Sequence, residues 1–136
     1  SVPNPYSQGS TISMYITQSK KTKTNLKFIN NYPYITCDIN VTGDILSLEE
    51  GLDYSNEEVL KTIQEYTNAF LEQNISSYLY KTAKEYKTDI ASFGKYAIKN
   101  YSTWTDWYNW PANYENSFFK VNVNSSIQSG QLFTKI

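Results

Sequence analysis

Histidine and arginine are both absent from this 136-residue sequence, so all twelve basic residues are lysines. Without histidine the chain lacks the commonest general base and the commonest transition-metal ligand, which excludes a Ser-His-Asp or Cys-His site within it. Without arginine it lacks the planar guanidinium that binds phosphate and carboxylate through paired hydrogen bonds. The net charge of −1 argues against a nucleic-acid partner. We therefore expect a non-enzymatic protein with no cofactor.

Cysteine and long apolar runs are also scarce. Cys37 is the single cysteine, which excludes an internal disulfide and a zinc cluster. It lies in the stretch YITCDIN, where apolar and polar residues alternate, so we interpret it as a buried strand residue and not as a nucleophile. No apolar run approaches about 18 residues, so the sequence predicts neither a signal peptide nor a membrane span.

Two clusters of charge allow more than one interpretation. Acidic residues gather between positions 49 and 58, where a solvated helix start is favoured because the spacing of calcium ligands is matched only loosely. The basic cluster consists of Lys20, Lys21, Lys23 and Lys27. We expect these lysines to lie at a polar hairpin tip that blocks edge pairing, with attraction to an anionic membrane as the alternative.

The N-terminal third of the chain has the pattern of β-strands. Positions 1–9 contain prolines and a glycine and are expected to form a linker or arm, partly disordered. Apolar and polar residues alternate from Ile12 and again from Leu26, with a polar hairpin tip predicted at 18–23. A second turn is predicted at 30–33, and a third strand ends at Gly43. Sequential strands with short turns predict an antiparallel meander.

Helical spacing replaces the alternation after this point. Ser55 and Glu58 form a capping box, so a long helix is predicted over about residues 56–86. Its apolar positions are expected to face the core: Leu60, Ile63, Tyr66, Phe70, Leu71, Tyr78 and Leu79.

Two shorter helices are predicted to follow. Thr88 or Asp89 caps the first, which carries Ile90 and Phe93 on its apolar side. Gly94 costs such a helix about 1 kcal/mol relative to alanine, so we expect close approach of another group there. The second runs from a cap at Ser102 and stops before Pro111.

Alternation returns in the C-terminal segment. Phe119, Val121 and Val123 share one face of a terminal strand, and Gly130 is expected at a bulge or turn. The order of strands, helices and strand predicts an α+β fold. We expect an antiparallel sheet of about four to five strands, packed on one face by one long and two shorter helices, in a single domain over residues 10–136.

Aromatic residues are the most abundant candidates for a binding site. Tyr66, Phe70, Phe93 and Trp107 coincide with apolar positions of the predicted helices, so we interpret them as core. Trp104 and Trp110 are expected to be half exposed and are the candidate partner surface. Carboxylate pairs such as Asp38 with Asp44, or Asp89 with Glu85, lack any supporting catalytic motif.

The stretches AKEYKTDIASFGKYAIKNYSTWTDWYNW and FFKVNVNSSIQSGQL resemble the C-terminal domain of the Ger(x)C family, the GerAC-type C subunits of spore germinant receptors. The resemblance extends over nearly the whole chain from Ser10. It rests on Thr88, Asp89, Ile90, Phe93, Gly94, Trp104, Trp107, Val121, Val123 and Gly130. The segment WTDWYNWP departs from the family, which usually carries more charge there.

The resemblance implies a function that the residues alone do not indicate. Members of this family are lipoproteins on the outer face of the spore inner membrane, where they work with integral-membrane A and B subunits that sense nutrients. It implies that the chain is the last domain of such a lipoprotein, with the lipid anchor upstream. The expected role is a scaffold or docking surface for partner subunits. The alternative is a module that binds a small molecule or glycan through exposed tryptophan and tyrosine.

Overall fold

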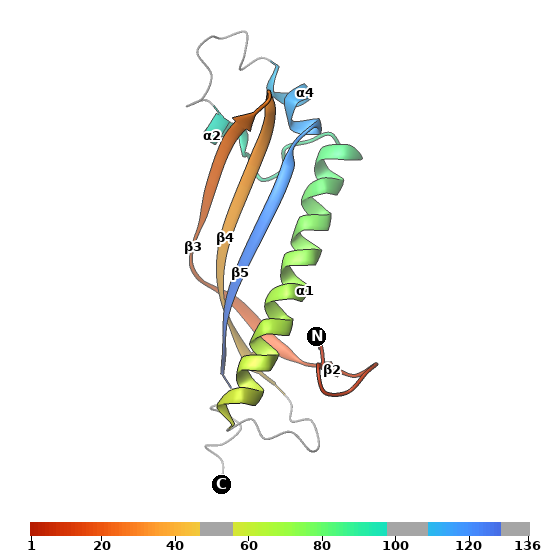
Figure 1. Ribbon diagram of the computed structural model, residues 1–136, viewed down its shortest axis with the longest axis vertical. Helices are drawn as coiled ribbons and strands as arrows, with labels where there is room; N and C mark the ends of the chain where they lie inside the picture. Colours follow the sequence, from red (N-terminus) through yellow and green to blue (C-terminus); the bar gives the residue numbers. More distant parts are fainter. Residues whose placement is uncertain (47–55, 98–108, 129–136) are drawn as a thin grey trace. The chain divides into compact units, whose positions relative to one another are not determined.

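A computed structural model of the chain describes residues 1–46, 56–97 and 109–128 (Figure 1). The strands are β1 (Val2–Pro3), β2 (Thr11–Ile12), β3 (Met14–Ile29), β4 (Tyr32–Ile45) and β5 (Phe118–Gln128). The helices are α1 (Glu57–Lys84), α2 (Gly94–Ala97) and α4 (Trp110–Glu115). One sheet pairs β1 with β2, and the other has the order β3-β4-β5. The predicted α+β class is confirmed.

Contacts divide the chain into two compact units. The first contains Ser1–Lys21, Ile39–Glu72 and Val123–Ile136, and the second contains Thr22–Asp38 and Gln73–Asn122. Strands β3, β4 and β5 and helix α1 each contribute residues to both units. The expected single domain over 10–136 stays a prediction.

The hairpin between β3 and β4 turns on two asparagines. Asn30 and Asn31 have φ values of 51° and 69°, the left-handed conformation that a two-residue hairpin turn requires and that asparagine tolerates. The predicted turn at 30–33 is confirmed. The predicted hairpin tip at 18–23 is wrong, because β3 continues through it for 16 residues. A lysine-rich segment suits β3 because β3 is an edge strand, and charged side chains at an edge hinder pairing with another chain.

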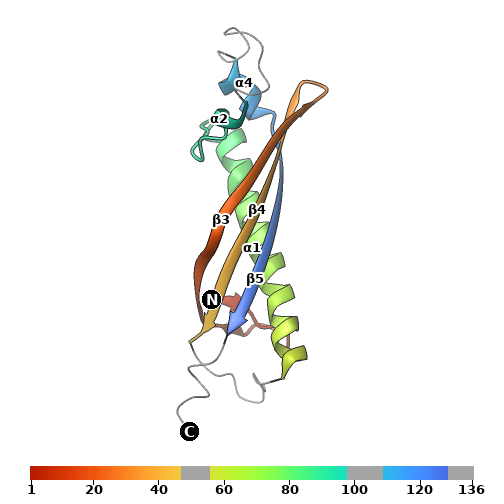
Figure 2. The same cartoon turned by 90° about the vertical axis from the view of Figure 1, so that its left-hand side faces the viewer.

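Strand β5 joins the sheet parallel to β4, which corrects the prediction of a wholly antiparallel sheet. Tyr34 stacks on Phe118, and four residues further along both strands Asp38 accepts a hydrogen bond from Asn122. This constant offset requires the two strands to run in the same direction, as the arrows of Figure 2 show. Parallel neighbours need a long crossover, which α1 and the segment after it supply.

The first unit closes around a core that includes the N-terminus. Val2 pairs with Ile12 across β1 and β2, and both side chains are buried. The cluster is completed by Met14, Ile45, Ile63 and Ile127, with Ile16, Val59, Leu60 and Phe70 packed against it. The expectation of a partly disordered arm at 1–9 is therefore wrong for Val2. Its apolar side chain anchors the segment, while the Asn4 side chain accepts a hydrogen bond from Tyr6 N–H.

Gly43 lies where this core is tightest. A Cβ atom at this position would stand 2.8 Å from Ile127 Cδ1 and 3.2 Å from the Met14 sulfur. Both neighbours belong to the core cluster. Glycine thus allows close approach of these side chains, which would have to shift to accommodate a Cβ atom, and the strand continues past it to Ile45.

The core of the second unit is largely aromatic. Phe119 of β5 contacts the rings of Tyr80, Phe93 and Tyr114, with ring centroids 5.0 to 6.1 Å apart. The hydroxyl groups of Thr82 and Tyr114 lie 2.7 Å apart, so the buried phenol has a polar partner. In this unit α1, α2 and α4 thus pack on the face of the sheet that carries Phe119.

The long helix α1 begins and ends close to the predicted positions, but its N-cap is different. Asn56 Oδ1 accepts a hydrogen bond from Glu58 N–H at 2.8 Å, while Ser55 lies outside the described residues. Tyr66 and Tyr78 are exposed, so their assignment to the core is wrong. Part of the helix face that was expected to be apolar carries polar side chains instead, and these bond to the backbone of β5.

The predictions for the shorter helices need correction. Of the described residues in the predicted second helix, Gly94–Ala97 are helical, because Lys87 and Ser92 adopt positive φ angles of 52° and 59° before them. Ile90 is exposed instead of facing the core. The helix predicted from a cap at Ser102 falls largely in residues 98–108, which lie outside the described residues. Pro111 itself lies in the first turn of α4, where its missing N–H leaves no bond unmade.

Side chains of α1 bond the backbone of β5, whose outer edge would otherwise be unpaired. In the first unit Ile127, Ser125 and Val123 donate their N–H groups to Gln64 Oε1, Asn68 Oδ1 and Glu72 Oε2 at 3.1, 2.9 and 2.8 Å. In the second unit Phe119 N–H donates to Tyr80 Oη at 3.0 Å. Four residues of a helix rise about 6 Å and two residues of a strand about 6.6 Å. Acceptors spaced four residues apart on α1 therefore match donors spaced two residues apart on β5. We call these four bonds the edge ladder.

Asn68→Leu tests the edge ladder. The substitution keeps the side-chain size but leaves Ser125 N–H without its acceptor, so we expect the free energy of unfolding to fall by about 1 kcal/mol. Urea denaturation followed by circular dichroism measures the change. Asn74→Leu, at an exposed position of the same helix, is the control. Equal stability of the two variants would contradict a structural role for the ladder.

Candidate functional site

The face of the sheet opposite the helices carries an exposed aromatic group in the second unit. In β4 and β5 the residues that alternate with the buried ones point to this face. The rings of Tyr34 and Phe118 are stacked with centroids 4.8 Å apart and an interplanar angle of 14°. Tyr32 meets Phe118 edge to face at 6.1 Å. Stacking fixes these rings without burying them.

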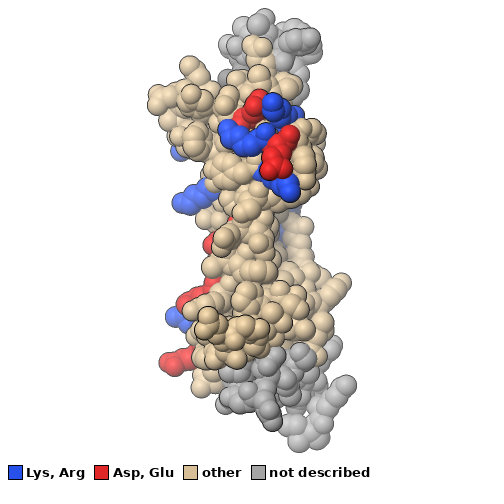
Figure 3. Space-filling view, turned by 90° about the vertical axis from the view of Figure 1, so that its right-hand side faces the viewer, with Lys and Arg blue, Asp and Glu red and all other residues tan. Residues whose placement is uncertain are grey.

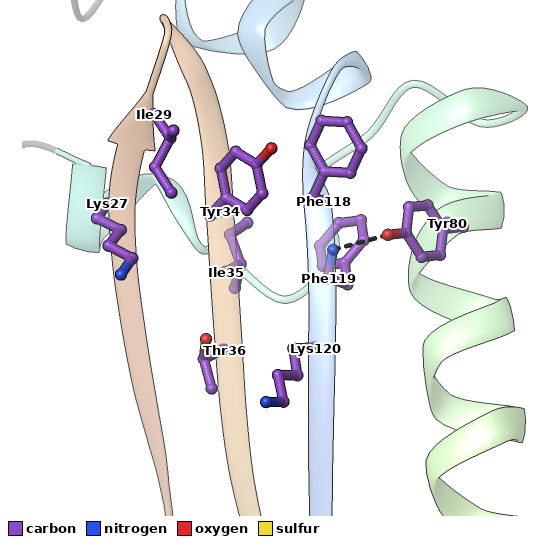
Figure 4. Close-up of a pocket in the computed structure, with 9 residues that line it drawn as sticks. All are labelled: Lys27, Ile29, Tyr34, Ile35, Thr36, Tyr80, Phe118, Phe119 and Lys120. Carbon is purple, nitrogen blue, oxygen red and sulfur yellow. Dashed lines mark hydrogen bonds between the residues drawn. The ribbon is translucent and has the colours of Figure 1, made fainter.

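Exposure distinguishes this group from the core aromatics. Ile29 is 39% exposed, Tyr32 48% and Phe118 45%. The adjoining depression has a volume of about 500 Å³ and is lined by Lys27, Ile29, Tyr34, Ile35, Thr36, Tyr80, Phe118, Phe119 and Lys120 (Figure 4). Exposed apolar residues that cluster on one face commonly mark an interaction surface. We call the set Lys27, Ile29, Tyr32, Tyr34, Thr36, Phe118 and Lys120 the outer patch.

Lysines border the outer patch. Lys27 from β3 and Lys120 from β5 both line the depression, and Thr36 of β4 lies between them in Figure 4. Within the part of the chain that the structure describes, no carboxylate lies within ion-pair distance of either lysine. Asp38, on the same face, instead accepts a hydrogen bond from Asn122 at 2.9 Å. The patch is therefore apolar at its centre and positively charged at its border.

Another group of charged side chains is of mixed sign. On the side of the molecule that Figure 3 faces, lysines and acidic residues lie next to one another in one cluster. Lys87 pairs with Glu115 at 3.5 Å, and both side chains are well exposed. An exposed pair of this kind contributes little to stability. Charge of mixed sign makes this cluster a poorer candidate for selective binding than the outer patch.

Asp89 has a structural role that explains the motif around it. Its Oδ1 accepts a hydrogen bond from Phe93 N–H at 2.8 Å, and its Oδ2 accepts one from Gly94 N–H at 2.7 Å. Oδ2 also accepts a hydrogen bond from Trp110 Nε1 at 3.0 Å. One carboxylate thus joins the turn before α2 to the start of α4. Phe93 and Gly94 are buried, and the close approach expected at Gly94 stays a prediction.

Trp110 does not offer a surface to a partner, which corrects the expectation from sequence. It is only 5% exposed, and its indole packs against Tyr114 with ring centroids 5.7 Å apart. Its nitrogen is occupied by Asp89. Of the other predicted site residues, Trp104, Trp107 and Gly130 lie outside the described residues.

The outer patch was missed because its residues lie in the polar phase of the strand alternation. Tyr32, Tyr34 and Phe118 occupy positions that elsewhere on β4 and β5 carry Asp, Asn, Gln, Ser, Thr or Lys. Aromatic residues at several neighbouring polar-phase positions were the signal that could have indicated an exposed site.

Titratable groups show no arrangement for catalysis in the described residues. Burial raises the pKa of the Cys37 thiol, which disfavours the reactive thiolate. Burial also raises the pKa of Tyr114, with the hydrogen bond to Thr82 acting in the opposite direction. Residues 1–46, 56–97 and 109–128 contain no cluster of ligands that would hold a metal ion. None of their helices is long and apolar enough to span a membrane.

The protein is a helix-covered sheet of the α+β class with one face exposed in its second unit, and a solved structure shares this fold. The chain is similar to the crystal structure of the GerBC protein, with a TM-score of 0.62 and 18% identity over 87% of this chain. The match covers 41% of the GerBC chain, so this chain spans less than half of that length. A search of curated proteins finds no match.

The family is given by the sequence itself. Residues 1–130 match the family described as spore germination B3/GerAC-like, C-terminal. The chain belongs to this family, which confirms the resemblance seen in the motif around Asp89. The match begins at the first residue and so includes the packed N-terminal segment.

Asp89→Asn tests the carboxylate that joins α2 and α4. An amide has one acceptor where the carboxylate has two, so one of the three N–H donors faces an NH₂ group. We expect the free energy of unfolding to fall by about 1.5 to 3 kcal/mol, as for a lost hydrogen bond to a charged group. Chemical denaturation measures this, with the exposed Asp44→Asn as control. If both variants unfold alike, the carboxylate is not the anchor.

Tyr114→Phe tests the buried phenol through pH. A pKa raised above the unfolded value of about 10 means that the neutral phenol stabilises the fold below pH 10, and that this stability is lost as pH rises through the folded pKa. The variant loses the Thr82 bond, which costs about 1 kcal/mol at pH 7. The difference from the native chain should shrink by pH 11 in urea titrations, because Phe does not ionise. A constant difference would contradict burial of the neutral form; the exposed Tyr86→Phe is the control.

Proposed function

We propose that the chain is a non-enzymatic docking domain of a spore germinant receptor C subunit. In this proposal it is the last domain of a larger lipoprotein that is anchored upstream to the outer face of the spore inner membrane. Its partners are the integral-membrane A and B subunits of the receptor. Membership in the spore germination family and the fold shared with GerBC support this assignment.

The outer patch is the observation that carries the docking role. Ile29, Tyr32 and Phe118 are each between about two fifths and one half exposed and lie on one face of the sheet. The rings of Tyr32 and Phe118 are also held in place by ring contacts. Aromatic anchors of this kind lose little conformational entropy on binding and commonly dominate the energy of an interface. The two groups with raised pKa values, Cys37 and Tyr114, are buried and take no part in this surface.

Co-purification of the receptor tests the proposal. The full-length C subunit carrying Tyr32→Ser and Phe118→Ser is expressed with the A and B subunits in spores, and the recovered partners are quantified. We expect at least about a tenfold loss of recovery, because losing two anchors removes more than about 1.4 kcal/mol of binding free energy.

The control matches the number and exposure of the changed rings. Tyr66 and Tyr86 are 52% and 51% exposed and do not belong to the outer patch, so Tyr66→Ser with Tyr86→Ser should leave recovery unchanged. Circular dichroism of both double variants checks that each is folded. Normal recovery of both partners by the outer-patch variant would show that this face is not the docking surface.

The depression favours one alternative function, the binding of a small molecule or glycan. Its volume of about 500 Å³ and the flat stacked rings at its border suit a sugar or an amino acid. Trp110 no longer supports this function, because its ring is buried. Calorimetric titration with sugars and amino acids separates the two functions: saturable heat that Phe118→Ser abolishes would favour the ligand module.

A further inference from the structure

We propose that the outer patch takes an acidic, extended segment of a partner protein. Carboxylates of the segment meet Lys27 and Lys120, and an apolar side chain between them packs on Ile29, Tyr32 and Phe118. This inference rests on the proposed docking function and adds the chemistry of the partner.

Charge complementarity carries the choice of an acidic partner. The residues that line the depression include two lysines and no acidic residue. Three other lysines of the second unit have local partners: Lys87 pairs with Glu115, and Lys81 and Lys95 lie over the rings of Tyr86 and Tyr96. Lys27 and Lys120 have no such interaction within the described part of the chain. Both side chains are exposed, so an incoming carboxylate reaches them without a change in the fold.

The spacing of the two lysines suits an extended backbone. Lys27 and Lys120 lie on β3 and β5, with β4 between them. Two strand spacings amount to about 10 Å, which an extended chain covers in about three residues. A segment that crosses the strands would therefore place two carboxylates about three residues apart over the lysines. The Thr36 hydroxyl lies between them in Figure 4, where it can donate to the same segment.

The aromatic residues of the outer patch favour a protein segment over a partner that is recognised by its charge alone. In Figure 4 the rings of Tyr34 and Phe118 and the side chain of Ile29 lie beside the two lysines on the same face. An anionic lipid surface attracts lysines through their charge and does not need these rings. A segment with both acidic and apolar side chains uses the whole patch, and the lysines exclude basic segments.

Charge reversal tests the acidic partner in the full-length C subunit expressed with its receptor subunits. Lys27→Glu with Lys120→Glu should lower partner recovery at least about tenfold, because attraction becomes repulsion. Lys27→Met with Lys120→Met keeps the apolar stems and should lower it less. Recovery by the native protein should also fall as salt rises. Lys81→Glu with Lys84→Glu, at the end of α1, is the control and should leave recovery unchanged.

A peptide with two glutamates three residues apart and phenylalanine between them probes the patch directly. Titrated into the ¹⁵N-labelled chain, it should shift the amide signals of Lys27, Tyr34, Thr36, Phe118 and Lys120. The same peptide with lysine in place of glutamate should not shift them. Binding of both peptides alike, or of neither, would overturn the acidic specificity.

The outcomes separate this inference from the docking function on which it rests. If Tyr32→Ser with Phe118→Ser abolishes recovery while charge reversal leaves it unchanged, the patch docks a partner that is not acidic. If neither pair of substitutions changes recovery, docking through this face is wrong. If charge reversal releases the chain only from vesicles of phosphatidylserine and phosphatidylcholine, the occupant is a lipid surface and the inference fails.

Discussion

The edge ladder between α1 and β5 is the interaction on which the architecture depends. A parallel strand added after a long crossover has one edge paired to β4 and one edge open, and an open edge is a site for misassembly. Gln64, Asn68 and Glu72, spaced four residues apart on α1, accept hydrogen bonds from alternate N–H groups of β5, so the helix fixes the register of the strand as well as covering it. Apolar packing alone would not specify the register so sharply, because it has no direction.

The position of α1 determines which face of the sheet stays exposed. In the second unit the helices and the rings of Phe93, Tyr114 and Phe119 occupy one side of the sheet. The alternate side chains of β4 and β5 therefore face away from the helices, and there the aromatic residues have only one another as partners. The alternation of side chains along β4 and β5 therefore places the residues that pack against the helices on one face and the outer patch on the other.

Much of the fold followed from the sequence because its signals are local. The long helix, the turn at the two asparagines and the terminal strand each have a periodicity or a turn residue of their own. The direction of β5 has no such signal, since parallel and antiparallel neighbours show the same alternation. The exposed Tyr66 and Tyr78 were assigned to the core because they fall near helical spacing, and that spacing assigned no role to the polar Gln64, Asn68 and Glu72. Those polar side chains contact the strand backbone instead.

The candidate site was harder to predict than the fold, and Trp110 shows why. A tryptophan is equally suited to a core and to an interface, and only its neighbours decide between them. Here the Asp89 carboxylate binds the indole nitrogen while also holding Phe93 and Gly94, so the most distinctive motif of the family organises the interior. Tyr32, Tyr34 and Phe118 have no distinctive motif, yet they form the exposed surface. A motif that defines a family therefore need not lie on its exposed surface, and the exposed aromatic residues of the second unit lie on the strand face opposite the helices.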